Sequence, residues 1–99
     1  MINMIEPETE LKPKRTVHDG DGWVIYCPGC KYLHKFRYGW SFNGNTEFPT
    51  FSPSLVIRLV HEKDARCHSF VRDGKIEFLQ DCKHELAGQT VKLPILEEY

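Results

Sequence analysis

Short runs of β-branched and aromatic residues alternate with turn-forming residues along most of the chain. Within these runs apolar and polar positions tend to alternate, which is typical of half-buried β-strands. The runs occupy residues 16–18, 23–26, 32–38, 55–61, 67–72, 75–82 and 89–93. Residues 82–88 fit one short helical turn, with Asp81 as its N-cap and Gly88 at its end. The pattern predicts a mainly β fold of about six or seven short strands with at most one short helix.

The clearest hairpin signal is Asp73-Gly74, because an Asp-Gly pair favours a two-residue turn of type I′. Such a turn places Arg72 opposite Lys75 and fixes the register of the two flanking strands. One face of this hairpin is then expected to carry Cys67, Ser69, Val71, Ile76, Phe78 and Cys82. The opposite face is expected to carry His68, Phe70, Leu79 and Asp81. A second hairpin is predicted around residues 19–22, which form a dense Asp-Gly turn signal.

Residues 1–15 contain Glu6-Pro7-Glu8 and Lys12-Pro13-Lys14, which interrupt any helical or strand period. We interpret them as an N-terminal arm and residues 16–99 as one β domain. Lacking a basic region followed by an apolar block, the N-terminus does not resemble a secretory signal. The longest apolar runs are far shorter than the roughly 20 residues that cross a bilayer. These features predict a cytoplasmic protein with no membrane partner.

Charge and cysteine content narrow the function classes. Thirteen basic and fourteen acidic residues give a formal net charge of −1, which provides no general attraction for phosphate backbones. A nucleic-acid partner is therefore not expected. In a reducing compartment the four cysteines favour metal ligands over disulfides.

The cysteines are spaced as metal ligands. Cys27-Pro28-Gly29-Cys30 is a knuckle in which two thiolates can point at one ion. In the predicted register Cys67 and Cys82 are diagonal neighbours and supply a second pair. We therefore predict a structural zinc ion bound by Cys27, Cys30, Cys67 and Cys82. In the alternative, His68 or His84 replaces one sulfur, and three protein ligands plus water make an open catalytic site.

Three histidines lie close to cysteines in the sequence, and these are His34, His68 and His84. They can surround the zinc ion and hydrogen-bond its thiolates. With Asp81 they can instead form a separate polar site for a second metal or for acid–base chemistry. The candidate catalytic residues are thus His34, His68, Asp81 and His84.

The segment 39–54 is rich in aromatic, hydroxyl and amide side chains, and its Pro and Gly residues exclude a helix. Its aromatic residues can simply fill the core of a small domain. Alternatively, the segment forms a ligand-binding wall made by Trp40, Phe42, Asn43, Thr50, Ser52 and Ser54.

Known zinc-enzyme motifs are absent from the sequence. No His-x-Glu precedes the cysteine knuckle as a deaminase requires. His61-Glu62 and His84-Glu85 begin a His-Glu-x-x-His motif, but Ala65 and Gly88 occupy its closing positions.

Several motifs together resemble a family of small uncharacterised phage and prophage proteins, often labelled ammonia monooxygenase. They are the Cys-Pro-Gly-Cys knuckle, His34, and the stretches 40–44, 49–54, 67–74 and 81–88. The resemblance covers roughly residues 23–94. It implies a phage or prophage origin, and so the cytoplasm of a host cell, together with a shared Cys/His framework. It implies no activity.

Two functions of different classes follow from these features. The first is a binding module that uses residues 40–54 to bind a host protein or a small ligand, in host takeover or against host defence. The alternative is a zinc-dependent hydrolase that acts on a nucleotide or a related small molecule.

Overall fold

The computed structural model describes residues 13–58 and 66–96 of the 99-residue chain. Within them the chain forms eight β-strands and no helix, so the predicted mainly β fold is confirmed. The strands are β1 (Val17–Asp19), β2 (Gly22–Cys27), β3 (Tyr32–Arg37), β4 (Ser41–Phe42), β5 (Phe51–Arg58), β6 (Arg66–Arg72), β7 (Lys75–Phe78) and β8 (Thr90–Lys92). No helix that could cross a membrane occurs in these two ranges.

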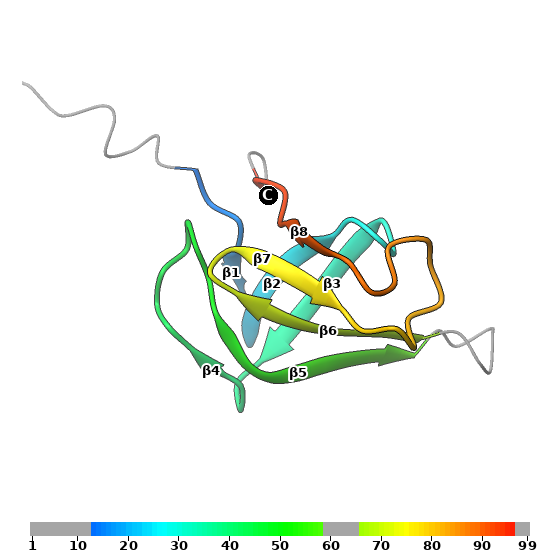
Figure 1. The fold of residues 1–99 in the computed structure, drawn as a ribbon. Helices are drawn as coiled ribbons and strands as arrows, with labels where there is room; N and C mark the ends of the chain where they lie inside the picture. Colours follow the sequence, from blue (N-terminus) through cyan, green and yellow to red (C-terminus); the bar gives the residue numbers. More distant parts are fainter. Residues whose placement is uncertain (1–12, 59–65, 97–99) are drawn as a thin grey trace, which may run out of the picture.

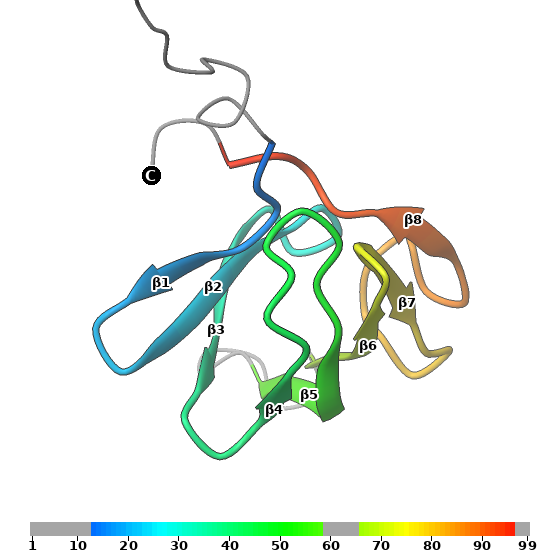
Figure 2. The same ribbon diagram turned by 90° about the vertical axis from the view of Figure 1, so that its left-hand side faces the viewer.

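The strands form two antiparallel sheets, with the orders β1-β2-β3 and β4-β5-β6-β7-β8. Figure 1 shows β5, β6 and β7 side by side in front of β2 and β3. In Figure 2 the first sheet lies on the left, and the second curves along the bottom and the right. The core is therefore enclosed between the two sheets.

Stacked aromatic rings join the sheets. The Phe36 ring of β3 stacks on Phe51 of β5 with centroids 4.2 Å apart, and Phe51 stacks on Phe42 of β4 at 4.7 Å. Phe36 and Phe51 are almost fully buried, and burying such a side chain stabilises a fold by about 1.5–3 kcal/mol. Part of the aromatic segment thus fills the core.

Both predicted hairpins form. Asp73 and Gly74 have φ angles of 52° and 76°, as a type I′ turn requires, and Arg72 pairs with Lys75. The six residues predicted to share the inner face are all buried: Cys67, Ser69, Val71, Ile76, Phe78 and Cys82. In the first hairpin Asp19 pairs with Gly22.

The structure also corrects several expected elements. Eight strands are present in the described ranges instead of six or seven, because residues 41–42 form the short strand β4. The strand expected from Leu55 begins at Phe51, and residues 59–61 of that prediction lie outside the described ranges. Residues 82–88 form successive turns instead of a helical turn, with bonds such as Ala87 N–H to the His84 carbonyl (3.2 Å).

Most of the predicted arm, residues 1–12, lies outside the described ranges. Its last residue, Arg15, contacts the domain. The Arg15 guanidinium donates to the carbonyls of Leu93 (3.0 Å) and Glu47 (2.8 Å) and lies over the Phe48 ring.

Candidate functional site

Ser54, His68 and Asp81 form a hydrogen-bonded chain on the outer face of the second sheet. His68 Nε2 lies 3.2 Å from Ser54 Oγ, and His68 Nδ1 lies 3.4 Å from Asp81 Oδ2. We call these three residues the triad. The His68 side chain is 25% exposed and that of Asp81 is 44% exposed, so the triad is open to a substrate.

The irregular pairing of β5 with β6 brings Ser54 to His68. Phe51 pairs with Val71, and Leu55 pairs with Ser69. Residues 52–54 of β5 therefore lie opposite a single residue of β6, Phe70. The strand bulges here, and bulges commonly redirect a side chain beside an active site. The indole Nε1 of Trp40 holds the bulge by donating to the carbonyls of Pro53 (3.1 Å) and Ser54 (3.3 Å).

His68 and Asp81 are positioned by the end of the β6–β7 hairpin. Leu79 N–H donates to the His68 carbonyl (2.9 Å), which extends the ladder beyond β7. Cys82 Sγ lies 3.1 Å from the His68 amide nitrogen and 3.0 Å from its carbonyl oxygen. Cys82, which follows Asp81, therefore holds the backbone of His68 in place.

This arrangement has the order of contacts found in serine hydrolases. The Asp81 carboxylate can hold the proton on Nδ1, which leaves Nε2 free to take the proton of the Ser54 hydroxyl. The His68 tautomer with its proton on Nδ1 is assigned from these contacts. In the chain the order is Ser, His, Asp, and such triads are recognised by geometry and not by sequence order.

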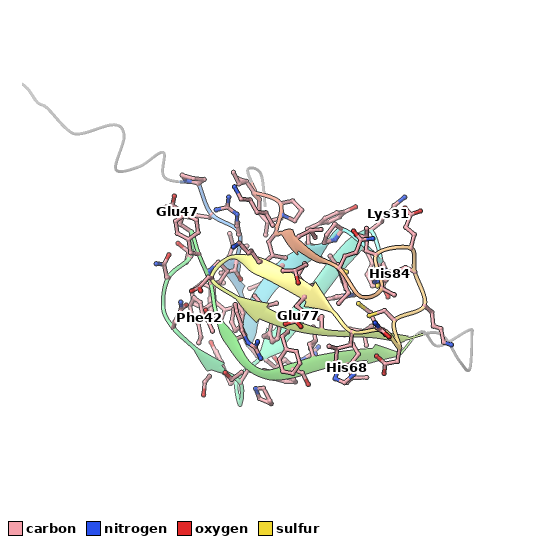
Figure 3. The ribbon with its side chains drawn as sticks, in the orientation of Figure 1. Lys31, Phe42, Glu47, His68, Glu77 and His84 are labelled. Carbon is pink, nitrogen blue, oxygen red and sulfur yellow. The ribbon has the colours of Figure 1, made fainter. Side chains whose placement is uncertain are left out.

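A second cluster lies on the inner side of the same hairpin. Cys27, Cys30, His34 and Cys67 each offer a ligand atom, all within 4.8 Å of one another, and so could hold a metal ion. Cys67, Cys82 and His84 form an adjoining group of the same kind. We call these six residues the cysteine cluster. Figure 3 shows His84 beside Lys31 and His68 on the opposite side of the hairpin.

The distances in the cysteine cluster suit a tetrahedral ion. Cys27 Sγ and Cys67 Sγ are 3.8 Å apart. Zinc–sulfur bonds of about 2.3 Å give a tetrahedral edge of about 3.8 Å. Cys30 N–H also donates to Cys27 Sγ (3.3 Å), which stabilises a thiolate in the knuckle.

The thiols of the cysteine cluster differ in pKa. The hydrogen bond from Cys67 and the neighbouring His34 lower the pKa of Cys27 to about 4, against its burial. Burial and the Cys27 charge raise the pKa of Cys30 to about 11. The hydrogen bond to Cys27 and burial also raise the pKa of Cys67. A metal cation supplies the charge that lets several of these thiols ionise together.

His34 is 3% exposed, and its Nε2 has no hydrogen-bond partner among the described residues. A buried imidazole nitrogen without a partner is costly unless it binds an ion or water. This nitrogen and the thiol-rich donor set both fit a metal ion.

His84 covers the knuckle from the other side. Its Nδ1 accepts the Leu86 amide hydrogen (3.2 Å), and its Nε2 lies 3.5 Å from Cys67 Sγ. A neutral imidazole that accepts at Nδ1 carries its proton at Nε2. In this state His84 donates to the Cys67 sulfur.

The structure therefore separates the candidate residues into two places. His68 and Asp81 join Ser54 in the triad, whereas His34 and His84 join the cysteines. The four predicted metal ligands are brought near one another, but Cys82 groups with Cys67 and His84 instead of with all three other cysteines.

The candidate ligand-binding residues also divide. Asn43 organises its own loop, because its Oδ1 accepts from the amides of Asn45 and Thr50 and its Nδ2 donates to the Phe48 carbonyl. Phe42 stacks on Phe51, and the Thr50 hydroxyl accepts from the Asp73 amide (2.8 Å). Ser52 is exposed. A ligand-binding role for these side chains stays a prediction.

Sequence reasoning placed Ser54 in a binding segment and missed its contact with His68. The available signal was the outer face of the hairpin, which predicted His68 and Asp81 on one side. A serine from the adjoining strand on that face completes the triad.

Comparison with known proteins gives one finding. Residues 3–79 match the family BubE, described as the bacterial ubiquitination-like system serine protease. No curated protein and no solved structure shows a significant match.

Proposed function

The chain belongs to the BubE family, and on that premise we propose that it is a serine protease of a bacterial ubiquitination-like system. The observation that carries the proposal is the contact of His68 with both Ser54 Oγ and Asp81 Oδ2. Ser54 is the nucleophile, His68 the general base and acid, and Asp81 the residue that orients the imidazole. The substrate is a protein component of such a system.

Each residue has a defined task in peptide-bond cleavage. Ser54 Oγ attacks the carbonyl carbon while His68 Nε2 takes the hydroxyl proton. The tetrahedral intermediate then breaks its C–N bond, and the leaving amine takes that proton from His68. A water molecule attacks the resulting ester on Ser54 and gives a proton to His68. His68 returns this proton to Ser54 Oγ as the ester bond breaks, which restores the Ser54 hydroxyl and releases the carboxylic acid product.

We also propose that zinc is the metal of the cysteine cluster. Thiolate-rich tetrahedral sites select soft or borderline ions of this kind. Cys27, Cys30 and Cys67 would hold it, with the fourth position taken by His34 or by Cys82. Bound there, zinc supplies a cross-link between strands. Cys67 and His68 point to opposite faces of β6, so the ion does not contact the triad.

The zinc-dependent hydrolase inferred from the sequence differs from this proposal in its nucleophile. It requires a metal-bound water in an open site, whereas Ser54 here contacts a histidine directly. Phage origin, the host-binding role and the cytoplasmic location stay predictions.

A serine-directed probe tests the proposal. An ethyl fluorophosphonate reacts with activated serine hydroxyls, and intact-mass spectrometry counts the adducts. We expect one adduct at Ser54, with at least about a 100-fold slower reaction in His68→Ala, since general-base catalysis contributes roughly 10²–10⁴-fold. Ser54→Ala should take up no probe.

Ser52→Ala is the matched control, because Ser52 is an exposed serine of the same strand that touches neither His68 nor Asp81 in the described contacts. It should react at the wild-type rate. Equal labelling of wild type and His68→Ala, or an adduct at Ser52, would show that Ser54 is not an activated nucleophile.

A further inference from the structure

One edge of β5 is open beyond Ser54, whose carbonyl accepts from Trp40 Nε1. β4 pairs with β5 at Phe51 and Ser52, and beyond this point the described strands leave that side of β5 unpaired as far as Arg58. Figure 1 shows this part of β5 along the lower border of the sheet, with β6 above it. The opposite side pairs with β6 from Leu55 to Arg58.

The backbone groups of Val56 point to this open edge. Val56 lies directly opposite His68, whose amide contacts Cys82 Sγ and whose carbonyl accepts from Leu79. Both backbone groups of His68 therefore point away from β5. In an antiparallel ladder, hydrogen-bonded and non-hydrogen-bonded pairs alternate, so Val56 and His68 form a non-hydrogen-bonded pair. The N–H and C=O of Val56 are consequently directed outward.

The edge is continuous with the triad. Val56 follows Ser54 by two residues, which is about 6.6 Å along a strand. Its side chain is 41% exposed and lies on the same face as His68. Beside it, the Phe70 ring stacks on His68 with centroids 6.4 Å apart, and the Arg72 guanidinium lies 4.5 Å from the Phe70 ring centroid. An extended chain on this edge meets a partly apolar face next to the nucleophile.

We propose that the peptide substrate binds as an added β-strand on the open edge of β5, exchanging main-chain hydrogen bonds with Val56. This inference rests on the proposed protease function, because the substrate is the chain whose carbonyl Ser54 attacks. An unpaired strand edge is a general template for an extended peptide, and main-chain bonds then provide affinity with little demand on sequence. The residue bound to Val56 lies about two positions from the scissile bond.

Two probes separate binding at the edge from reactivity of the triad. The first is the ethyl fluorophosphonate, which has no peptide. The second is a mixture of N-acetyl tetrapeptidyl diphenyl phosphonates, randomised at the three positions before the phosphonate residue. The readout is the ratio of the two labelling rates at Ser54, so each protein variant serves as its own reference.

Val56→Pro removes the outward N–H without removing a ladder donor, because that N–H does not bond to β6. We expect the ratio to fall about five- to tenfold, as for one lost hydrogen bond. Val56→Ala keeps the backbone donor and is the matched control, expected to retain most of the ratio. An unchanged ratio in Val56→Pro overturns the edge proposal and leaves the protease function intact.

A second measurement keeps the test decisive if Val56→Pro does not fold. In wild-type protein, tetrapeptidyl probes N-methylated at one position at a time lose one donor each. Selective loss of rate at the position facing the Val56 carbonyl supports the proposal, and equal rates at all positions contradict it.

Failure of both probes to label wild type refutes the protease function, and with it this inference. A concentration-dependent dimer that Val56→Pro abolishes would assign the edge to a second copy of the chain.

Discussion

A methyl group added at position 29 would collide with an imidazole ring. A Cβ at this position would lie far inside van der Waals contact distance of Cε1, Nε2 and Nδ1 of His84. The packing of His84 therefore requires a glycine at position 29, in addition to any requirement of the turn. This contact packs residues 82–88 against the cysteine cluster.

Gly29→Ala should lower the free energy of unfolding by about 1–3 kcal/mol, as expected for an overpacked site. The measurement is chemical denaturation of the purified protein. In a His84→Ala background the same substitution should cost less than about 0.5 kcal/mol, because the ring is gone. If Gly29→Ala costs the same in both backgrounds, His84 does not pack on the knuckle.

Among the elements, the β6–β7 hairpin was predictable to the level of side-chain faces. Its turn, register and buried residues follow from Asp73-Gly74 and from strand alternation, which act between neighbours in sequence. For the same reason the sequence predicted that His68 and Asp81 share the outer face.

The position of Ser54 depends on long-range pairing that local patterns do not encode. The bulge at residues 52–54 and the pairing of β5 with β6 together decide which β5 residue meets His68. The short strand β4 likewise depends on its pairing with β5, in which Phe42 stacks on Phe51. The approach of Cys27 to Cys67 was likewise unpredictable, since it requires the two sheets to pack together.

Asp21, in the turn of the first hairpin, forms ion pairs with two residues of β3. Asp21 accepts from Lys35 Nζ (2.8 Å) and lies near Arg37 (3.4 Å), and the hydrogen bond from Lys35 holds the pKa of Asp21 below its ordinary value of 3.8. A carboxyl whose pKa is lowered by folding stabilises the fold above its unfolded pKa. That contribution disappears as the pH falls through the lowered value.

Asp21→Asn should therefore lower the melting temperature slightly at pH 7 and leave it unchanged near pH 2. The effect at pH 7 should shrink in high salt, because the pair is exposed to solvent. Thermal denaturation at the two pH values is the measurement. A larger loss at pH 2 than at pH 7 would contradict the assigned ion pair.

At the scale of the whole molecule, the cysteine cluster connects the two sheets. Cys27 ends β2 in the first sheet, and Cys67 lies in β6 of the second. A bound ion would fix the sheets to each other, and its binding free energy would add to the free energy of folding. In a domain of about 100 residues a loss of 1 kcal/mol lowers the melting temperature by roughly 4–8 °C.

Removal of the metal by a chelator should lower the melting temperature by at least about 10 °C, and added zinc should restore it. Labelling of Ser54 should fall in parallel, because Cys82 clasps the backbone of His68. Cys30→Ser should melt at lower temperature than wild type and respond weakly to the chelator. X-ray absorption of the wild-type protein counts its sulfur ligands.

Metal-free protein from a preparation without added zinc, together with wild-type melting of Cys30→Ser, would refute the zinc site. Loss of labelling without loss of stability would instead place the metal in the reaction.

Side chains of β6 alternate between its two faces, so neighbouring residues of this strand belong to two different sites. One hairpin supplies Cys67 and Cys82 to the cysteine cluster and His68 and Asp81 to the triad. Cys67 follows Cys27 by 40 residues, so at about 5–20 residues per second it leaves the ribosome roughly 2–8 s later. Until then the nascent chain lacks ligands of the proposed metal site and two residues of the triad. In the proposed protease, the activated serine and the metal site would therefore form together, when this hairpin closes.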